Sequence, residues 1–167
     1  MFTVGDKIVY PMHGAGIIQN LEEKDIDGQV SVYYVVNIPI GNLTVTISSK
    51  KINSLGIRYV TTKEEALVIL NNFTEIPQGI PENWNKRYEY NLEKIKSGEF
   101  GKVLEVYICL YLREKAKVLS GMEKKLLSSA KQIFLSELII SQNIRKDFAE
   151  NMLENFIKKF EPQNIIE

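Results

Sequence analysis

The sequence predicts an α+β protein in which a small β-barrel is followed by an all-α helical bundle. Three observations predict this class. The first sixty residues hold short β-branched and aromatic runs between glycine-containing turns, which is typical of small barrels. From about residue 62 the apolar residues recur at the helical period. A stretch with two prolines and a glycine, residues 72–82, predicts a linker between a first domain over 1–71 and a second over 83–167.

Four runs predict the strands of the first domain, at residues 7–10, 17–18, 30–38 and 43–47. Asp27-Gly28, between the second and third runs, is a strong signal for a hairpin turn. Residues 43–47 alternate strictly between apolar residues and threonines. Because successive side chains of a strand point to opposite faces, the apolar residues are expected on one face and the threonines on the other.

Helices are expected from residue 62 onwards. Thr62 with Glu65, and Ser120 with Glu123, fit the capping box, in which a hydroxyl and a carboxylate satisfy free N–H groups at a helix start. The first of these helices is expected to end at about residue 71. The remaining helices are expected at about residues 84–97, 100–117 and 148–160.

Composition excludes several classes of protein. The 167 residues carry 21 basic and 21 acidic side chains, and a hydrophobic content of 44% is enough for packed cores. One cysteine excludes a disulfide framework, and one cysteine with one histidine cannot complete a Cys/His zinc site. No secretory signal is visible, and the densest apolar run, residues 103–112, is about half a membrane span. We expect a soluble cytoplasmic protein that contacts no membrane.

No side chain predicts a catalytic reaction. His13 lies in a turn with no serine, cysteine or carboxylate cluster near it in the sequence. Gly14-Ala15-Gly16 lacks the third glycine and the following helix of a dinucleotide-binding loop. Cys109 lies inside the apolar run, where a thiol behaves as a small hydrophobic group. We therefore expect neither an enzyme nor a bound cofactor or metal.

The middle of the chain is basic although the net charge is zero. Residues 84–131 carry eleven basic and six acidic side chains, so an anionic partner is expected there. Trp84, the only tryptophan, starts a helix directly after the linker, and Lys86 and Arg87 follow it. In one interpretation the cations and the helix N-terminus bind phosphates while the indole meets bases. In the other, which helical spacing alone favours, Trp84 belongs to the buried face of its helix.

Two sets of motifs resemble one known family. The first set is Val4-Gly5-Asp6, Ile8-Val9-Tyr10-Pro11, His13-Gly14 and Gly16. The second set is Asn83-Trp84, Arg87-Tyr88, Asn91-Leu92-Glu93-Lys94, Ser97-Gly98, Lys102-Val103, Glu105-Val106, Leu119-Ser120, Glu123-Lys124, and Ala130 with Glu137-Leu138. Together they resemble the CarD/CdnL family of bacterial RNA polymerase-binding transcription regulators over roughly residues 1–160. The transcription-repair coupling factor shares the N-terminal module, but it is far longer and lacks the helical domain.

The resemblance implies a Tudor-like or SH3-like barrel that binds the β subunit of RNA polymerase. It also implies a helical domain that contacts promoter DNA at the upstream edge of the transcription bubble. There Trp84 is implied to wedge into the minor groove and stabilise the open complex, which reverses the interpretation that spacing favours. The residues expected to contact DNA are Trp84, Lys86, Arg87, Lys124, Lys125 and Lys131. The residues expected to contact the polymerase are Lys24, Leu43, Thr44, Val45, Thr46 and Ile47.

The chain departs from the family at three positions. Thr46 stands where relatives often carry arginine, and Glu89 and Ile108 replace residues that are basic in some relatives. Affinity for polymerase and DNA is then either lower or carried by other side chains. We expect a monomer that binds DNA weakly and without base specificity when alone, and that associates with the nucleoid through the polymerase. The alternative function is a protein-interaction module with a helical scaffold, in which Trp84 is buried and no DNA is contacted.

Overall fold

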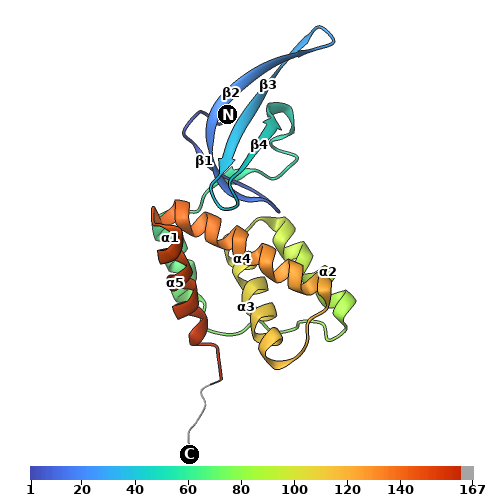
Figure 1. Ribbon diagram of the computed structural model, residues 1–167, viewed down its shortest axis with the longest axis vertical. Helices are drawn as coiled ribbons and strands as arrows, with labels where there is room; N and C mark the ends of the chain where they lie inside the picture. The colour runs from blue at the N-terminus through green and yellow to red at the C-terminus, as the bar shows by residue number, and fades with distance from the viewer. Residues whose placement is uncertain (163–167) are drawn as a thin grey trace, which may run out of the picture.

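The computed structural model describes residues 1–162, which form a β-sheet stacked on a layer of helices (Figure 1). The strands are β1 (Lys7–Tyr10), β2 (Gly14–Ile26), β3 (Gln29–Ile38), β4 (Leu43–Ser48) and β5 (Arg58–Tyr59), with a 3-10 turn, η1 (Ser49–Lys51), after β4. The helices are α1 (Lys63–Asn72), α2 (Trp84–Ser97), α3 (Phe100–Ala116), α4 (Gly121–Gln142) and α5 (Lys146–Lys158). The α+β class and the order of strands before helices are as predicted.

The sheet has the strand order β4-β3-β2-β1-β5, and every neighbouring pair is antiparallel. The sequence pattern left open whether the small barrel is closed or half-closed. In residues 1–162 the two end strands do not pair with each other, so the sheet is not a closed barrel. The physical reason is the length of β5. It pairs with β1 through Arg58 and Tyr59 only, and the chain then leaves the sheet to begin α1.

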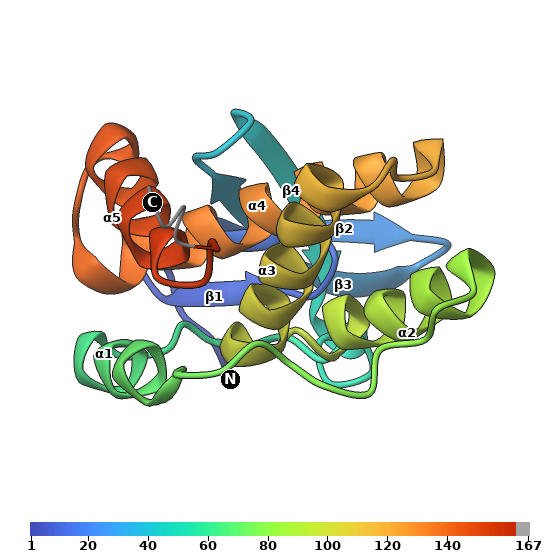
Figure 2. The same cartoon turned by 90° about the horizontal axis from the view of Figure 1, so that it is seen from below.

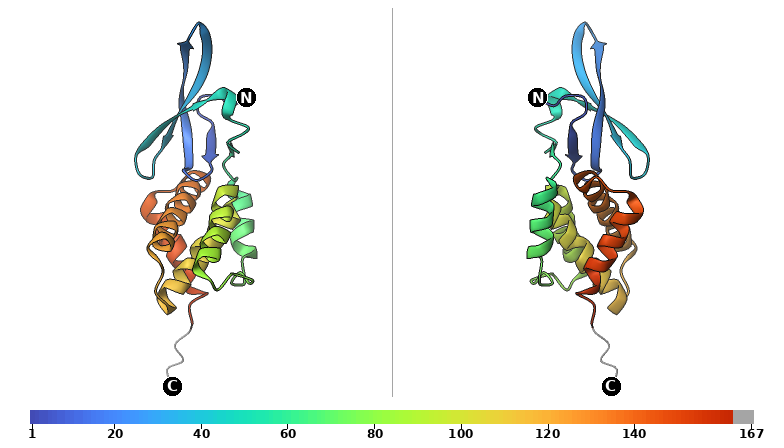
Figure 3. Two further views of the ribbon diagram at one scale, coloured as in Figure 1. Left: turned by 90° about the vertical axis from the view of Figure 1, so that its right-hand side faces the viewer. Right: turned by 90° about the vertical axis from the view of Figure 1, so that its left-hand side faces the viewer.

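The hairpin of β2 and β3 extends well beyond the other strands (Figure 3). Its turn is the predicted Asp27-Gly28, and both residues have positive φ angles, of 54° and 79°, as a type I′ turn requires. The sequence pattern located only the buried start of β2, because the outer half of this strand is polar and exposed. The apolar core of the sheet includes Ile18, Tyr34 and Ile47.

The helices enclose a second core, and α3 lies at its centre. Figure 2 shows α3 crossing in front of α4, with α2 on one side and α1 and α5 on the other. Seven residues of α3 are buried, as its nearly continuous apolar run predicts. Both capping boxes are confirmed, at Thr62 with Glu65 for α1 and at Ser120 with Glu123 for α4.

Helix α1 packs with the helices and not with the sheet. Its buried residue Ala66 belongs to the helical core, and Phe73 after it packs on Phe156 and Phe160 of the α5 region. The expected division at residues 71 and 83 stays a prediction, and the packing favours a boundary before α1. No helix in the described part of the chain is long and apolar enough to cross a membrane.

Candidate nucleic-acid interface

Helices α2 and α4 begin at the same end of the helical layer. The Nε of Arg87, on the first turn of α2, lies 2.6 Å from Oε1 of Glu123, on the first turn of α4. Arg87 also donates from Nη1 to the Glu82 carbonyl oxygen at 2.7 Å, which fixes the linker just before α2. Two helix N-termini therefore share one end of the molecule, and their free N–H groups and dipoles favour a negatively charged ligand there.

Trp84 is the first residue of α2, and its exposed fraction is 44%. Asn83 caps the helix by accepting hydrogen bonds from the backbone N–H groups of Asn85 and Lys86, at 3.0 and 3.2 Å. Ile95, three turns further on, is buried in the core. The helix thus begins beyond the end of the core, so its apolar stripe is buried only further along. The interpretation of Trp84 as a buried core residue is wrong.

Arg87 does not present a surface cation. Only 3% of the residue is exposed, and its guanidinium is held between Glu123 and the linker carbonyls. The expectation that Arg87 contacts DNA phosphates directly is therefore wrong. The capping box predicts Glu123 as a helix cap, but its second partner is 36 residues away in sequence, and no local pattern reveals such a pair.

The Glu123 carboxylate is fully enclosed yet charged. Burial alone would raise its pKa, but hydrogen bonds from Arg87 and from the backbone and hydroxyl of Ser120 hold the pKa below the ordinary value of 4.5. The negative charge of Glu123 is thus neutralised inside the protein. It does not repel an anion at the helix ends.

Ion pairing separates the basic residues of the segment 84–131 into two groups. Six of the eleven lie within 4.0 Å of a carboxylate, namely Arg87, Lys94, Lys96, Lys102, Arg113 and Lys115. The other five have no carboxylate partner among residues 1–162, and they are Lys86, Lys117, Lys124, Lys125 and Lys131. Because paired cations are largely neutralised, the second group carries the positive charge available to a partner.

Four of these five lysines lie at the end where α2 and α4 begin. Lys86 is on the first turn of α2, Lys124 and Lys125 are on the first turn of α4, and Lys117 follows α3 in the short loop that leads to α4. Lys117 and Lys124 line one shallow hollow. Lys131 is half-buried and lies about two turns further along α4.

Lys117 was not among the residues expected at DNA. In the sequence, the only feature that distinguishes Lys117 is its place just before the capping box of α4. Lysines on solvent-exposed faces show the same feature, so it does not identify a contact with DNA. Val118 beside it is 88% exposed, and Met122 on the first turn of α4 is also exposed. Exposed apolar groups thus accompany Trp84 and the lysines at this end.

Ile108 and Glu89 are two of the positions at which the chain departs from the family pattern, and both have defined surroundings. Ile108 is fully buried within α3, so nothing at this position reaches a partner. Glu89 is exposed on α2 and lines a groove with Lys86, Tyr90 and Lys94. Its carboxylate reduces the positive charge beside Lys86.

Strand β4 is a sheet edge, as its position in the strand order shows. Thr44 and Thr46 are exposed, Val45 is half-buried and Ile47 is buried. The predicted alternation of exposed and inward-facing residues is confirmed for residues 44–47, whereas Leu43, at the start of the strand, is exposed although it is apolar. The Ile47 side chain belongs to the sheet core, so the expectation that it contacts a partner is wrong for the side chain.

Lys24 lies on the projecting hairpin. It is exposed, its Nζ is 3.7 Å from a carboxylate oxygen of Glu22, and it lies over the ring of Tyr33 at 5.1 Å from the centroid. By the distance used for the helical lysines, Lys24 is a paired cation, so part of its charge is balanced by Glu22 at the protein surface.

The described residues hold neither a cluster of metal ligands nor a thiol that is ionised near neutral pH. Among residues 1–162 no group of three or more His, Cys, Asp or Glu side chains gathers as a metal site. Burial raises the pKa of the Cys109 thiol to about 11, so the group is almost wholly protonated near neutral pH.

Comparison with known proteins agrees with this two-part organisation. Residues 2–61 match the family model of the CarD-like/TRCF RID domain, and residues 68–154 match that of the CarD C-terminal domain. The chain is also 40% identical over 158 residues to a protein of Bacillus subtilis (strain 168) named "Putative transcription factor YdeB". The matched region covers 93% of this chain and 99% of that protein. With both modules matched in order along one chain, this protein belongs to the CarD family.

Proposed function

We propose that this protein is a transcription regulator that binds the RNA polymerase β subunit through β4. We further propose that it binds promoter DNA through the end of the helical layer at which α2 and α4 both begin. The observation that carries the proposal is the exposed Trp84 among lysines without carboxylate partners, at two helix N-termini. Membership of the CarD family and the name of the Bacillus subtilis relative support a role in transcription.

Polymerase binding by β4 rests on the free strand edge. An edge strand offers unpaired main-chain N–H and C=O groups, and a partner strand can extend the sheet through them. Main-chain pairing depends little on side chains, so Thr46 in place of arginine is tolerated. The exposed Thr44 and Thr46 face outward while Val45 and Ile47 anchor the strand to the sheet.

DNA binding rests on the combination of a wedge and a few cations. Apolar side chains that enter the minor groove unstack a base step at a cost of about a few kcal/mol, and the indole of Trp84 offsets part of that cost in an open complex. Lys86, Lys117 and Lys124 are placed to hold the phosphates beside it. So few phosphate contacts give weak binding on their own, and attachment to the polymerase raises the effective concentration of DNA.

The test compares three binding reactions of the purified protein. We expect binding to the isolated polymerase β subunit, weak binding to promoter duplex alone, and a longer lifetime of polymerase–promoter open complexes. Failure to bind the β subunit, or tight and sequence-selective binding to duplex without polymerase, contradicts the proposal. The alternative, a scaffold with a buried tryptophan, loses its main support because Trp84 is exposed.

A further inference from the structure

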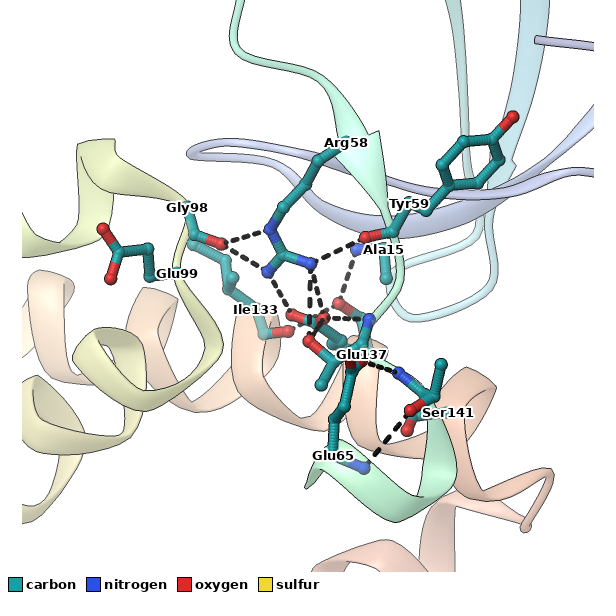
Figure 4. Close-up of polar contacts among 12 residues, drawn as sticks. Ala15, Arg58, Tyr59, Glu65, Gly98, Glu99, Ile133, Glu137 and Ser141 are labelled. Atoms are coloured by element: carbon teal, nitrogen blue, oxygen red, sulfur yellow. Dashed lines mark hydrogen bonds and ion pairs between the residues drawn. The ribbon is translucent and has the colours of Figure 1, made fainter. Parts of the chain in front are cut away.

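The sheet and the helices meet at a partly buried ion pair, in which the carboxylate of Glu137 is buried and the side chain of Arg58 is half-buried. Arg58 of β5 points down onto α4, where its Nη1 and Nη2 lie 2.8 and 2.9 Å from Oε1 and Oε2 of Glu137 (Figure 4). The same guanidinium donates from Nε to the carbonyl oxygen of Gly98, which ends α2, at 3.1 Å. One side chain of the sheet thus holds both α4 and the end of α2.

Glu137 is committed to this junction. Only 3% of the residue is exposed, and Oε1 also accepts hydrogen bonds from the backbone N–H and the hydroxyl of Thr61, at 2.9 and 2.7 Å. Two donors from Arg58 of β5 and two from Thr61 therefore converge on one carboxylate. A bidentate pair of this kind fixes orientation as well as distance.

The backbone of β2 also packs closely against α4 beside the ion pair. The backbone N–H of Ala15 donates to Ser136 Oγ at 2.8 Å, and that hydroxyl donates to the carbonyl oxygen of Ile133 at 2.6 Å. Gly14 lies so near that a Cβ placed on it would be 2.7 Å from Ser136 Oγ, and its φ of +115° is one that other residues rarely adopt. The start of β2 therefore rests directly on α4.

Helix α4 connects this junction to the end that carries Trp84. Glu123 and Glu137 are 14 residues apart on it, which is about 21 Å along the axis. Glu123 fixes the first turn of α2 through Arg87, and Arg58 fixes the last residues of α2 beside Glu137. Helices α2 and α4 thus run in the same direction and are tied to each other near both ends.

We propose that Arg58 and Glu137 are positioning residues that hold Trp84 at one place relative to the edge strand β4. The inference rests on the proposed function, because it concerns how the two binding surfaces act together. A flexible tether between the sheet and the helices would only raise the effective concentration of DNA near the helices. Insertion of a ring at one base step also needs orientation, and small misplacements of a reacting or inserting group are costly.

The test uses the full chain with Glu137→Gln, which keeps the shape of the side chain but removes its charge. Glu105→Gln is the matched control, since it breaks the 2.6 Å ion pair with Lys94 that lies wholly within the helices. Spin labels at Gln29→Cys and Asn155→Cys, both exposed positions, in a Cys109→Ala background report the distance between sheet and helices.

We expect a single narrow distance distribution for the unaltered junction and for Glu105→Gln, and a broad one for Glu137→Gln. Affinity of Glu137→Gln for the polymerase β subunit should stay within about twofold, while open-complex lifetime falls about tenfold. Arg58→Lys, which keeps the charge but loses the fork geometry, should act in the same direction if Glu137→Gln does not fold.

A distance distribution that stays narrow in Glu137→Gln overturns the positioning role, and so does a broad distribution with an unchanged lifetime. Trp84→Ala, measured in parallel, distinguishes this failure from a failure of the proposed function. A lifetime that Trp84→Ala shortens and Glu137→Gln does not contradicts the positioning role alone. A lifetime that neither variant shortens contradicts the proposed function.

Discussion

Trp84 and Arg87 lie three residues apart at the start of α2, and their surroundings give them opposite roles. The indole is exposed, while the guanidinium is buried against Glu123 and the linker. The two residues cooperate, because the buried one fixes the turn from which the exposed one projects. A substitution at Arg87 thus acts through stability and not through a lost phosphate contact.

Arg87→Ala should lower the free energy of unfolding by about 3–5 kcal/mol, since it leaves the fully buried Glu123 carboxylate without its partner. Lys86→Ala, its exposed neighbour, should change stability by less than about 0.5 kcal/mol. Urea denaturation of both variants measures the difference. Equal stabilities would show that the Arg87–Glu123 pair does not hold the helix ends together.

The Arg87–Glu123 pair should also make stability depend on pH. The folded-state pKa of Glu123 lies below its ordinary value of 4.5, so its contribution is present above that pH and is lost as pH falls through the folded pKa. The stability difference between the unaltered protein and Glu123→Gln should therefore shrink from pH 7 to pH 3. A difference that stays constant over this range would mean that the carboxylate charge adds nothing.

Lys117 should contribute to DNA affinity although no sequence motif marks it. Lys117→Ala should reduce the slope of log affinity against log salt by about one, because one phosphate contact is lost. Lys96→Ala is the control, since Lys96 is also exposed but lies 3.4 Å from a carboxylate oxygen of Glu93. Titrations of duplex DNA at several salt concentrations measure the slopes. The same slope for both variants would contradict the inference that lysines without a carboxylate partner are the ones that contact DNA.

Among the single elements, β4 is the strand proposed to bind the polymerase, whereas the proposed DNA contacts lie on the helices. Val45 pairs with Val36 of β3, and proline at this position removes an N–H group and cannot fit a continuous strand. Val45→Pro should abolish binding to the polymerase β subunit and leave duplex binding by the helices unchanged. Co-purification with the β subunit measures the first effect, and retained co-purification would place the interface elsewhere.

The elements themselves were largely predictable from the sequence, but their pairing in space was not. The sequence correctly predicted the Asp27-Gly28 turn and the capping boxes at Thr62 and Ser120, because each of these features depends on residues within four positions of one another. The open sheet and the placement of α1 depend on contacts between distant segments. The lysines could be counted in the sequence, but which of them remain unpaired depends on the fold.

In the molecule as a whole, the surfaces proposed to bind polymerase and DNA lie on different layers, and α4 spans from the junction with the sheet to the end that carries Trp84. The sheet carries the free edge of β4, and the helices carry Trp84 at their far end. The layers are tied by Arg58 and Glu137, and this tie would hold the two proposed partners in one orientation. Such a bridge need not bind DNA tightly, because the polymerase delivers the DNA to it.

In the proposed function, Trp84 stabilises the open promoter complex while β4 holds the polymerase. The most direct test is the lifetime of open complexes after a competitor is added, measured with the unaltered protein, Trp84→Phe and Trp84→Ala. We predict that Trp84→Ala loses most of the lifetime increase while its polymerase binding and melting temperature stay nearly unchanged, because the indole is exposed. Trp84→Phe should keep part of the increase, since it retains a flat apolar ring of smaller area. An unchanged lifetime with Trp84→Ala, or a lost lifetime together with unfolded helices, would contradict the account.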